Sequence, residues 1–286
     1  MRPSWSYEEM GKIPGQPWRL LDTGSLDAFR NMSIDEAVLT SFVPSRTSIT
    51  LRLYQWSRPS LSIGRFQRYD EIDWEACSRL GIDVVRRPTG GNALLHKSEL
   101  TYSFIVPESQ LPPSFHDSCR HINRALKQAF ARLGIATEAP IKRKTRPRPV
   151  CFMSTSEGEL THQGKKILAC AQVRKKGVVL QHGSMVIRHE PELLLSLVNL
   201  PHDKKEKSLR RYMSGATSIS ECTAAEININ DLKDIVVSGF SDAFEADFTA
   251  SEMKTEEISR FNELLHGKYM RTAWNQEGRW NEKRSQ

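Results

Sequence analysis

The chain has 286 residues, a formal net charge of +7 at pH 7, and 38% hydrophobic and 26% charged residues. Its length suits one large domain or one domain with a modest appendage, and its composition is that of an ordinary soluble globular protein. It contains no run of about 20 apolar residues that could cross a bilayer. Residues 1–15 also lack the apolar core of a secretory signal. We therefore expect no membrane partner and a cytoplasmic location.

The basic charge predicts an acidic partner but does not identify it. Nucleic acid is not expected, because the sequence has no zinc-finger spacing, homeodomain-like recognition helix or RNP motif. The five cysteines stand at scattered positions without a C-x-x-C pair, which argues against a disulfide framework and a structural zinc site.

The first half of the chain is expected to begin with an irregular arm at 1–17. Apolar residues recur at helical spacing over 26–42 and alternate with polar residues over 49–54. Gly81 and Gly134 suit the position just after a helix end. In order, the predicted elements are a helix at 26–42, strands at 49–54 and 61–63, a helix at 70–80, strands at 83–87 and 100–106, and a helix at 115–133.

The second half opens with a basic, proline-interrupted segment at 141–148, which is expected to be a loop. Two hairpin turns, Gln163-Gly164 and Lys176-Gly177, separate the three strands predicted next, at 157–162, 166–174 and 178–187. Helices are predicted at 190–200, 231–244 and 252–265. The tail after Gly267 is expected to be loose apart from Tyr269 and Trp274.

Helices and hairpins are mixed along the chain rather than strictly alternating. This arrangement predicts an α+β fold in which mixed sheets are flanked by helices. We expect an N-terminal arm at 1–17, one catalytic domain at 18–250, and a C-terminal helix with a polar tail at 251–286.

A Gly-Gly turn follows the strand predicted at 83–87, in the sequence RRPTGGNA that starts at Arg86. Glycines let the backbone approach a ligand closely, because no side chain stands in the way. The arginine pair could bind a carboxylate or a phosphate. The alternative is a tight hairpin with exposed arginines.

Three further side chains are candidates for chemistry. Lys166, in GKKI, could polarise a carbonyl or hold a phosphate, or could be a solvated hairpin charge. His182, in QHGS, could be a general base, although a lone strand histidine is more often structural. Cys151 follows the basic run at 142–148, whose charges would favour a reactive thiolate; the alternative is a buried spectator cysteine.

Taken in order, these segments resemble the lipoate–biotin protein ligase fold family over roughly residues 18–215. Each motif is weak alone, but the ordered set is specific. The matching segments are NMSIDEA at 31–37, the strand region at 52–64, RRPTGG with the downstream histidine and ELTYS, GKK-x₄-AQ, and QHGS. Within the family the chain is most similar to cysteine-dependent octanoyl-[carrier protein]:protein octanoyltransferases. It has P-x-C-F where ATP-dependent lipoate ligases carry an Asn-Asp pair.

The resemblance implies an enzyme of lipoate biosynthesis that needs no metal and no cofactor. Its donor would be octanoyl-acyl carrier protein, and its acceptor a lysine of a lipoyl domain or of the glycine cleavage H protein. Position by position, Cys151 becomes the nucleophile that forms an acyl thioester, and Lys166 binds the acyl carbonyl. The other positions carried over form or adjoin the wall of the acyl site: Arg87, Thr89, Gly90, Gly91, His96 and His182.

The chain departs from the family pattern at the expected acyl pocket. Asn92 replaces the usual Gly or Arg, and Ala169 and Cys170 replace Gly-Ser, which leaves the preferred chain length open. Cys170 is also a second candidate nucleophile, but burial in its apolar strand should raise its pKa. Two other functions stay open: an ATP-dependent lipoate ligase with Lys166 on the adenylate phosphate, and a non-catalytic binding protein on the same scaffold.

Overall fold

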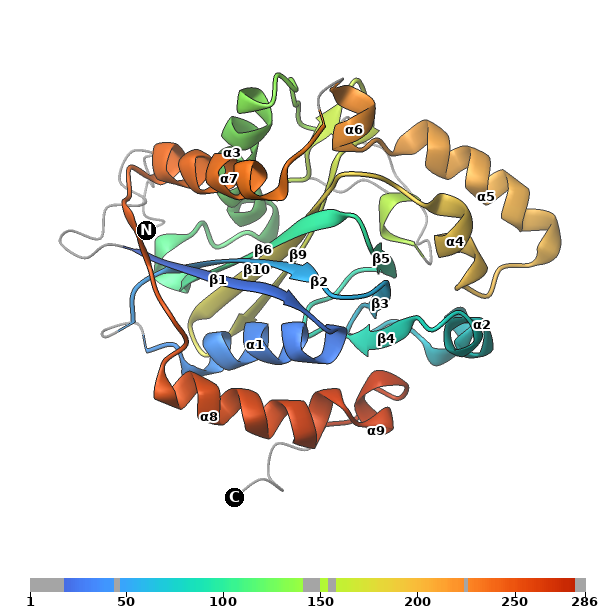
Figure 1. Cartoon of the computed structure of the whole chain (residues 1–286), viewed down its shortest axis with the longest axis horizontal. Coiled ribbons are helices and arrows are strands. Elements are labelled where there is room, and N and C mark those ends of the chain that lie inside the picture. The colour runs from blue at the N-terminus through green and yellow to red at the C-terminus, as the bar shows by residue number, and fades with distance from the viewer. Residues whose placement is uncertain (1–17, 44–46, 141–149, 154–157, 224–225, 281–286) are drawn as a thin grey trace.

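The computed structural model describes residues 18–43, 47–140, 150–153, 158–223 and 226–280. Its main feature is a six-stranded sheet in the order β11-β1-β2-β6-β10-β9. Figure 1 labels β1, β2, β6, β9 and β10 of this sheet. The strands are β1 (Trp18–Leu26), β2 (Thr50–Trp56), β6 (Glu99–Pro107), β9 (Leu168–Lys175), β10 (Val178–Val186) and β11 (Phe248–Ala250). β1 is parallel to β2 and β11, whereas β2, β6, β10 and β9 pair antiparallel. The predicted α+β fold with a mixed sheet is confirmed.

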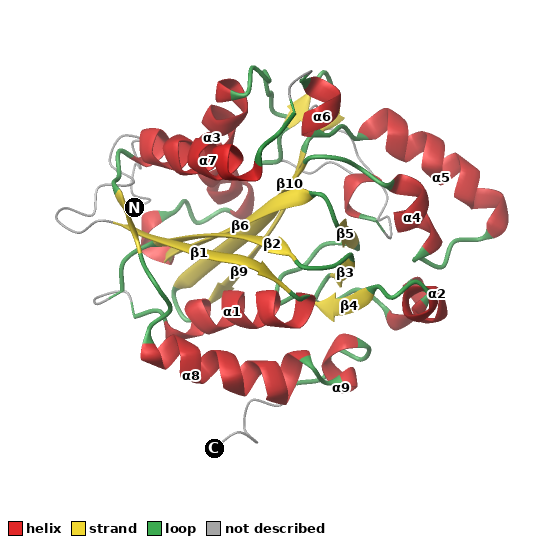
Figure 2. Cartoon of the chain, viewed as in Figure 1, coloured by secondary structure: helices red, strands yellow, loops and turns green. Residues whose placement is uncertain are grey.

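Helices cover both faces of this sheet (Figure 2). Helices α3 (Phe115–Arg132) and α7 (Ile229–Phe244) lie on one face, and α1 (Ala28–Ser41) and α8 (Thr255–Leu264) on the other. Successive strand residues point to opposite faces, so Phe104 packs with the α3–α7 layer while its neighbour Ile105 packs with α1. Because both faces are buried, all nine residues of β6 and of β10 are buried.

Two smaller sheets and several short helices complete the structure. The smaller sheets are β4-β3-β5, formed by β3 (Ser60–Ile63), β4 (Asp83–Arg86) and β5 (Leu94–His96), and the pair β7 (Thr161–His162) and β8 (Lys165–Lys166). The remaining helices are the 14-residue α5 (His202–Gly215) and the short helices α2 (Trp74–Arg79), α4 (Pro191–Ser196), α6 (Ile219–Cys222) and α9 (Thr272–Asn275). The helical turns are η1 (Tyr69–Glu71), η2 (Glu108–Gln110), η3 (Cys151–Met153) and the π-helical η4 (Leu265–Tyr269).

Local sequence explains several boundaries. In both predicted hairpin turns the two central residues have positive φ, at 49° and 75° for Gln163 and Gly164 and 51° and 77° for Lys176 and Gly177. Such backbone angles match the twist of a tight hairpin, so both turns are confirmed. The helix predicted at 70–80 is instead η1 followed by α2. Asp73 interrupts it, because its side chain accepts a hydrogen bond from the amide of Ala76 and begins a new helix.

The described part of the tail, residues 268–280, is not loose beyond the two expected anchors Tyr269 and Trp274, contrary to the expectation. It forms the end of η4 and α9, and Lys268, Tyr269, Trp274 and Asn275 are buried. Strands β1, β5 and β11 and helix α5 were also not predicted from the sequence. The predicted arm at 1–17 and basic loop at 141–148 lie outside the described residues. Among the residues that the structure describes, no helix is long and apolar enough to span a membrane.

Candidate active site

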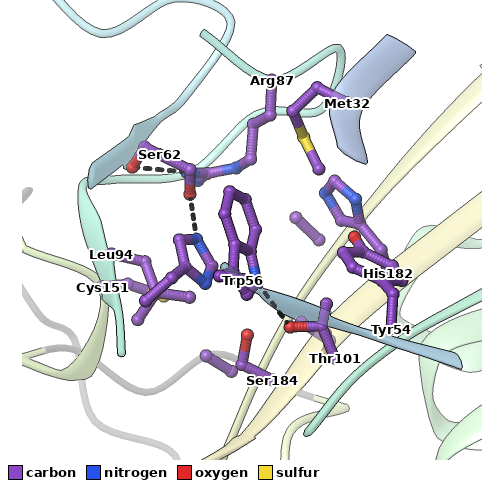
Figure 3. A pocket seen from close by; sticks show the side chains of 16 residues that line it. Met32, Tyr54, Trp56, Ser62, Arg87, Leu94, Thr101, Cys151, His182 and Ser184 are labelled. Atoms are coloured by element: carbon purple, nitrogen blue, oxygen red, sulfur yellow. Dashed lines mark hydrogen bonds between the residues drawn. The ribbon is translucent and has the colours of Figure 1, made fainter. Parts of the chain in front are cut away.

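A cavity lies between the six-stranded sheet and the β4-β3-β5 sheet. Cys151 and Cys170 are partly exposed, whereas Met32 and Tyr54 are fully buried, so the two thiols mark the open end, and Figure 3 shows Cys151 across the cavity from Met32 and Tyr54. The lining residues are Met32, Tyr54, Trp56, Ser62, Arg87, Gly91, Leu94, His96, Thr101, Cys151, Ala169, Cys170, Ala171, His182, Gly183 and Ser184.

Arg87 holds the Gly-Gly turn against this cavity. Its Nη2 donates to the carbonyls of Gly90 (2.8 Å) and Asn92 (2.9 Å). The turn also packs tightly on a second loop, since a Cβ on Gly64 would lie 1.8 Å from the carbonyl oxygen of Gly91. Burial lowers the pKa of Arg87 to about 10, which leaves it charged at neutral pH. The arginines of this turn are therefore buried anchors rather than exposed hairpin charges.

His182 joins the cavity to a buried polar network. Its Nδ1 lies 3.0 Å from Oδ2 of Asp35, and its Nε2 lies 2.7 Å from the hydroxyl of Thr89. Burial raises the pKa of Asp35, but the charge of Arg52 and further hydrogen bonds outweigh this and lower it overall. Burial lowers the pKa of His182, and the hydrogen bond and charge of Asp35, which raise that pKa, do not fully offset this effect. The neutral ring thus donates from Nδ1 to the carboxylate and accepts at Nε2 from Thr89.

His96 belongs to a second network centred on Glu99. Oε1 of Glu99 accepts hydrogen bonds from Nδ1 of His96 (2.6 Å), the Thr101 hydroxyl (2.7 Å) and the Ser184 hydroxyl (2.8 Å). The His96 ring stacks on Trp56 with centroids 3.8 Å apart. Burial would raise the pKa of Glu99, but His96 and the hydroxyls lower it overall, so the carboxylate stays charged. This network fixes the polar wall of the cavity.

Sequence reasoning did not select Glu99, Thr101, Ser184 or Trp56 as site residues. One signal was available, because Glu99 and Thr101 are two residues apart on one strand and so share a face. Their partners come from other strands, and their proximity depends on the register that places Ser184 opposite Thr101.

Cys151 lies at the start of η3, where its amide donates to the carbonyl of Ala93 (3.0 Å). Nζ of Lys166 is 3.6 Å from Sγ of Cys151, 3.2 Å from its carbonyl oxygen and 2.7 Å from Oε1 of Glu159. Burial lowers the pKa of Lys166, but Cys151 and Glu159 raise it above its ordinary value. A buried ammonium group therefore faces the thiol. The effect of the 142–148 cations on Cys151 stays a prediction, since they lie outside the described residues.

Cys170 is the less suitable nucleophile. A hydrogen bond with the thiol of Cys119 and burial raise the pKa of Cys170 well above its ordinary value. A protonated thiol reacts slowly with a thioester, because the thiolate is the nucleophile. Cys170 is partly exposed rather than fully buried in its strand, and the hydrogen bond with Cys119, which was not predicted, is the larger cause of this shift.

The sequence matches the model of the lipoyl protein ligase A/B catalytic domain over residues 27–241. Curated relatives cover about nine tenths of the chain. The chain is 38% identical to octanoyltransferase LipM of Kyrpidia tusciae over 91% of its length and 98% of the relative's. It is 37% identical to octanoyltransferase LipM of Geobacillus kaustophilus over 90% of this chain and 97% of the relative. The chain belongs to the LipM octanoyltransferase family. The predicted enzyme class, an acyltransferase of lipoate biosynthesis, is thereby confirmed.

Solved structures place the fold independently. A bipartite lipoate protein ligase of Thermoplasma acidophilum, studied with its E2 lipoyl domain, has a TM-score of 0.80 at 23% identity, covering 94% of this chain and 99% of that one. A lipoate-protein ligase A bound with ATP has a TM-score of 0.76, also at 23% identity, covering 91% and 99%. At this identity the likeness confirms the predicted ligase-type catalytic fold.

Proposed function

We propose that Cys151 is the nucleophile that carries octanoyl from an acyl carrier protein to a lysine of a lipoyl domain or of the glycine cleavage H protein. The observation that carries this proposal is the buried Lys166 ammonium 3.6 Å from the Cys151 thiol, at the open end of the cavity. The relatives' name supports octanoyl as the acyl group, and the lipoyl domain of the Thermoplasma system supports the acceptor class. The cytoplasm is the compartment we propose for both partners.

In the first step the Cys151 thiolate attacks the thioester carbonyl carbon. The carbonyl oxygen becomes an oxyanion, which Lys166 stabilises from its position beside Sγ. The bond from carbon to the carrier sulfur breaks, and the carrier leaves as a thiolate that takes up a proton. Exchange of one thioester for another is nearly balanced in energy, so the step requires no ATP.

In the second step the neutral amine of the acceptor lysine attacks the Cys151 thioester. The Cys151 thiolate leaves, the amine loses a proton to water, and an amide forms. Conversion of a thioester to an amide is energetically downhill, which makes the transfer effectively irreversible.

The cavity beyond Cys151 would hold the acyl chain, between Trp56 and Leu94 and towards Met32. Each buried CH₂ contributes about 0.8 kcal/mol, so the depth of the closed end would select chain length. Arg87, Thr89, Gly90, Gly91, His96 and His182 are proposed as the supporting wall. Arg87, Gly91, His96 and His182 line the cavity, Thr89 holds His182, and Gly90 is held by Arg87.

The test is intact-protein mass spectrometry after mixing the enzyme with octanoyl-acyl carrier protein without ATP. We expect a single octanoyl adduct on the wild type and on Cys170→Ala, and none on Cys151→Ala. Cys170→Ala is the matched control, because it removes the other thiol that lines the same cavity. An adduct on Cys151→Ala, or activity only with ATP and free lipoate, would overturn the proposal, the latter in favour of a ligase.

A further inference from the structure

Helix α5 presents a strongly basic surface. Its five cations are all exposed: Lys204, Lys205, Lys207, Arg210 and Arg211. The helix has two acidic residues, Asp203 and Glu206, and Glu206 pairs with Arg210 at 2.9 Å. The helix therefore carries an excess of positive charge that faces solvent.

The opposite side of α5 packs on the turn that carries Cys151. Tyr212 is buried against Phe152, the residue after Cys151, with ring centroids 6.2 Å apart. The Tyr212 hydroxyl donates to Nδ1 of His189 (2.7 Å), whose ring also packs on Phe152 (4.7 Å). Just past the helix, the amide of Thr217 donates to the carbonyl of Lys166 (2.9 Å). The exposed cations thus have a fixed position relative to both proposed catalytic side chains.

This arrangement sets the charged surface back from the nucleophile. Tyr212 packs on Phe152, whereas Lys207 and Arg210 lie on the opposite side of the helix at 3.6 residues per turn, so a protein bound to these two cations is separated from the η3 turn by about one helix diameter, roughly 10 Å. Such a partner needs a long tether to deliver its acyl group. A phosphopantetheine arm provides that reach, whereas a lysine side chain is much shorter and requires its protein to sit directly over the cavity.

We propose that the basic face of α5 is the docking surface for an acidic acyl carrier protein, the donor in the function proposed above. The proposal rests on that function and adds the place where the donor binds. Complementary charge mainly accelerates encounter, so its loss should lower the rate of acylation by the carrier and leave the chemistry intact.

The test compares the double variants Lys204→Glu/Lys207→Glu and Lys127→Glu/Lys176→Glu. The second is the matched control, because its residues are exposed on other elements and the change in net charge is the same. Octanoyl-adduct formation on Cys151 is followed by intact mass with two donors: octanoyl-acyl carrier protein, and the small neutral thioester octanoyl-N-acetylcysteamine. We expect the α5 variant to lose about tenfold in rate with the carrier and nothing with the small thioester.

Three results would overturn the inference. The acylation rate with the carrier could fall equally in the control variant, the rate of the α5 variant could fall equally with the small thioester, or the α5 variant could show no fall in rate. A loss confined to transfer from preformed acyl-enzyme to the acceptor would assign the surface to the acceptor instead. Failure of the proposed function is a separate outcome, because the wild type would then form no Cys151 adduct with either donor.

Discussion

At the scale of single residues, buried charges of opposite sign hold the pocket side chains in defined states. Asp35 accepts a 2.6 Å hydrogen bond from Nη1 of Arg52 and orients the ring of His182. Glu99 orients His96 in the same way. Such charges are costly to bury unless they are paired and hydrogen-bonded. The polar wall is therefore organised before any substrate enters, which is the condition for electrostatic stabilisation of a reacting group.

Removing Lys166 should slow acylation of Cys151 without unfolding the protein. A substitution of Lys166 alone would also destabilise the protein, because the buried Glu159 carboxylate would lose its ion pair with Lys166. We therefore expect Lys166→Met/Glu159→Gln to lower the rate of adduct formation from a small octanoyl thioester by about 10²-fold, the loss typical of a single oxyanion donor. Glu159→Gln alone is the control and should keep most of the rate. Equal rates for the two variants would remove Lys166 from the mechanism.

At the scale of elements, the C-terminal segment is part of the pocket's support. The Arg86 guanidinium donates to the carbonyls of Trp274 (3.0 Å) and Gln276 (2.9 Å), and also to that of Gly64 (2.8 Å), which packs on Gly91. A second anchor lies beside it, since the buried Lys268 donates to Glu36 of α1. One arginine thus joins the tail to the loop that backs the Gly-Gly turn.

Arg86→Lys should destabilise the protein, because a lysine cannot reproduce this planar set of donors to carbonyls on separate segments. Hydrogen bonds to charged groups contribute about 1.5–3 kcal/mol each, so we expect a loss of about 3 kcal/mol in the free energy of unfolding, measured by urea denaturation. Arg79→Lys, an exposed position in α2, is the control and should change stability little. If both variants unfold at the same urea concentration, the tail is not held by Arg86.

At the scale of the whole molecule, stability comes from two helical layers that cover one sheet. The α3–α7 layer contains a buried histidine whose ring lacks hydrogen bonds, within the described part of the chain, to offset its burial. His121 is buried against Phe244, and neither of its ring nitrogens has a hydrogen-bond partner among the described residues. Burial lowers the pKa of His121 from 6.5 to about 4. The folded state therefore favours the neutral ring.

This shift makes global stability depend on pH. The unfolded chain binds a proton at His121 below pH 6.5, whereas the folded chain does so only near pH 4. The contribution of His121 is thus fully present above pH 6.5 and is lost as the pH falls towards 4. We expect His121→Leu to be more stable than the wild type, with an advantage on the order of 2 kcal/mol larger at pH 4.5 than at pH 7. His116→Gln, exposed on the same helix, is the control, and an equal pH response in the two variants would contradict this assignment.

Local signals predicted the elements whose partners are near in sequence. Backbone preference sets the hairpin turns at Gly164 and Gly177 and ends the long helix before Gly134. Apolar periodicity predicts that helix and the strands next to the turns. Short elements whose formation depends on distant partners were missed. β11 has no alternation of its own over three residues and exists because it pairs with β1, more than 200 positions earlier. α5 carries few apolar residues, and its helix is held by Tyr212 against Phe152.

The fold class, the family and the candidate pair Cys151 and Lys166 could be predicted from the sequence, because motif order and apolar periodicity are properties of the chain before it folds. The tertiary structure alone brought Lys166 to 3.6 Å from Cys151, placed Glu99 between His96 and Ser184, and packed the tail on Arg86. These contacts join residues from different strands and from opposite ends of the chain. Strand register and the burial of paired charges decide them, and neither can be read from spacing along one segment.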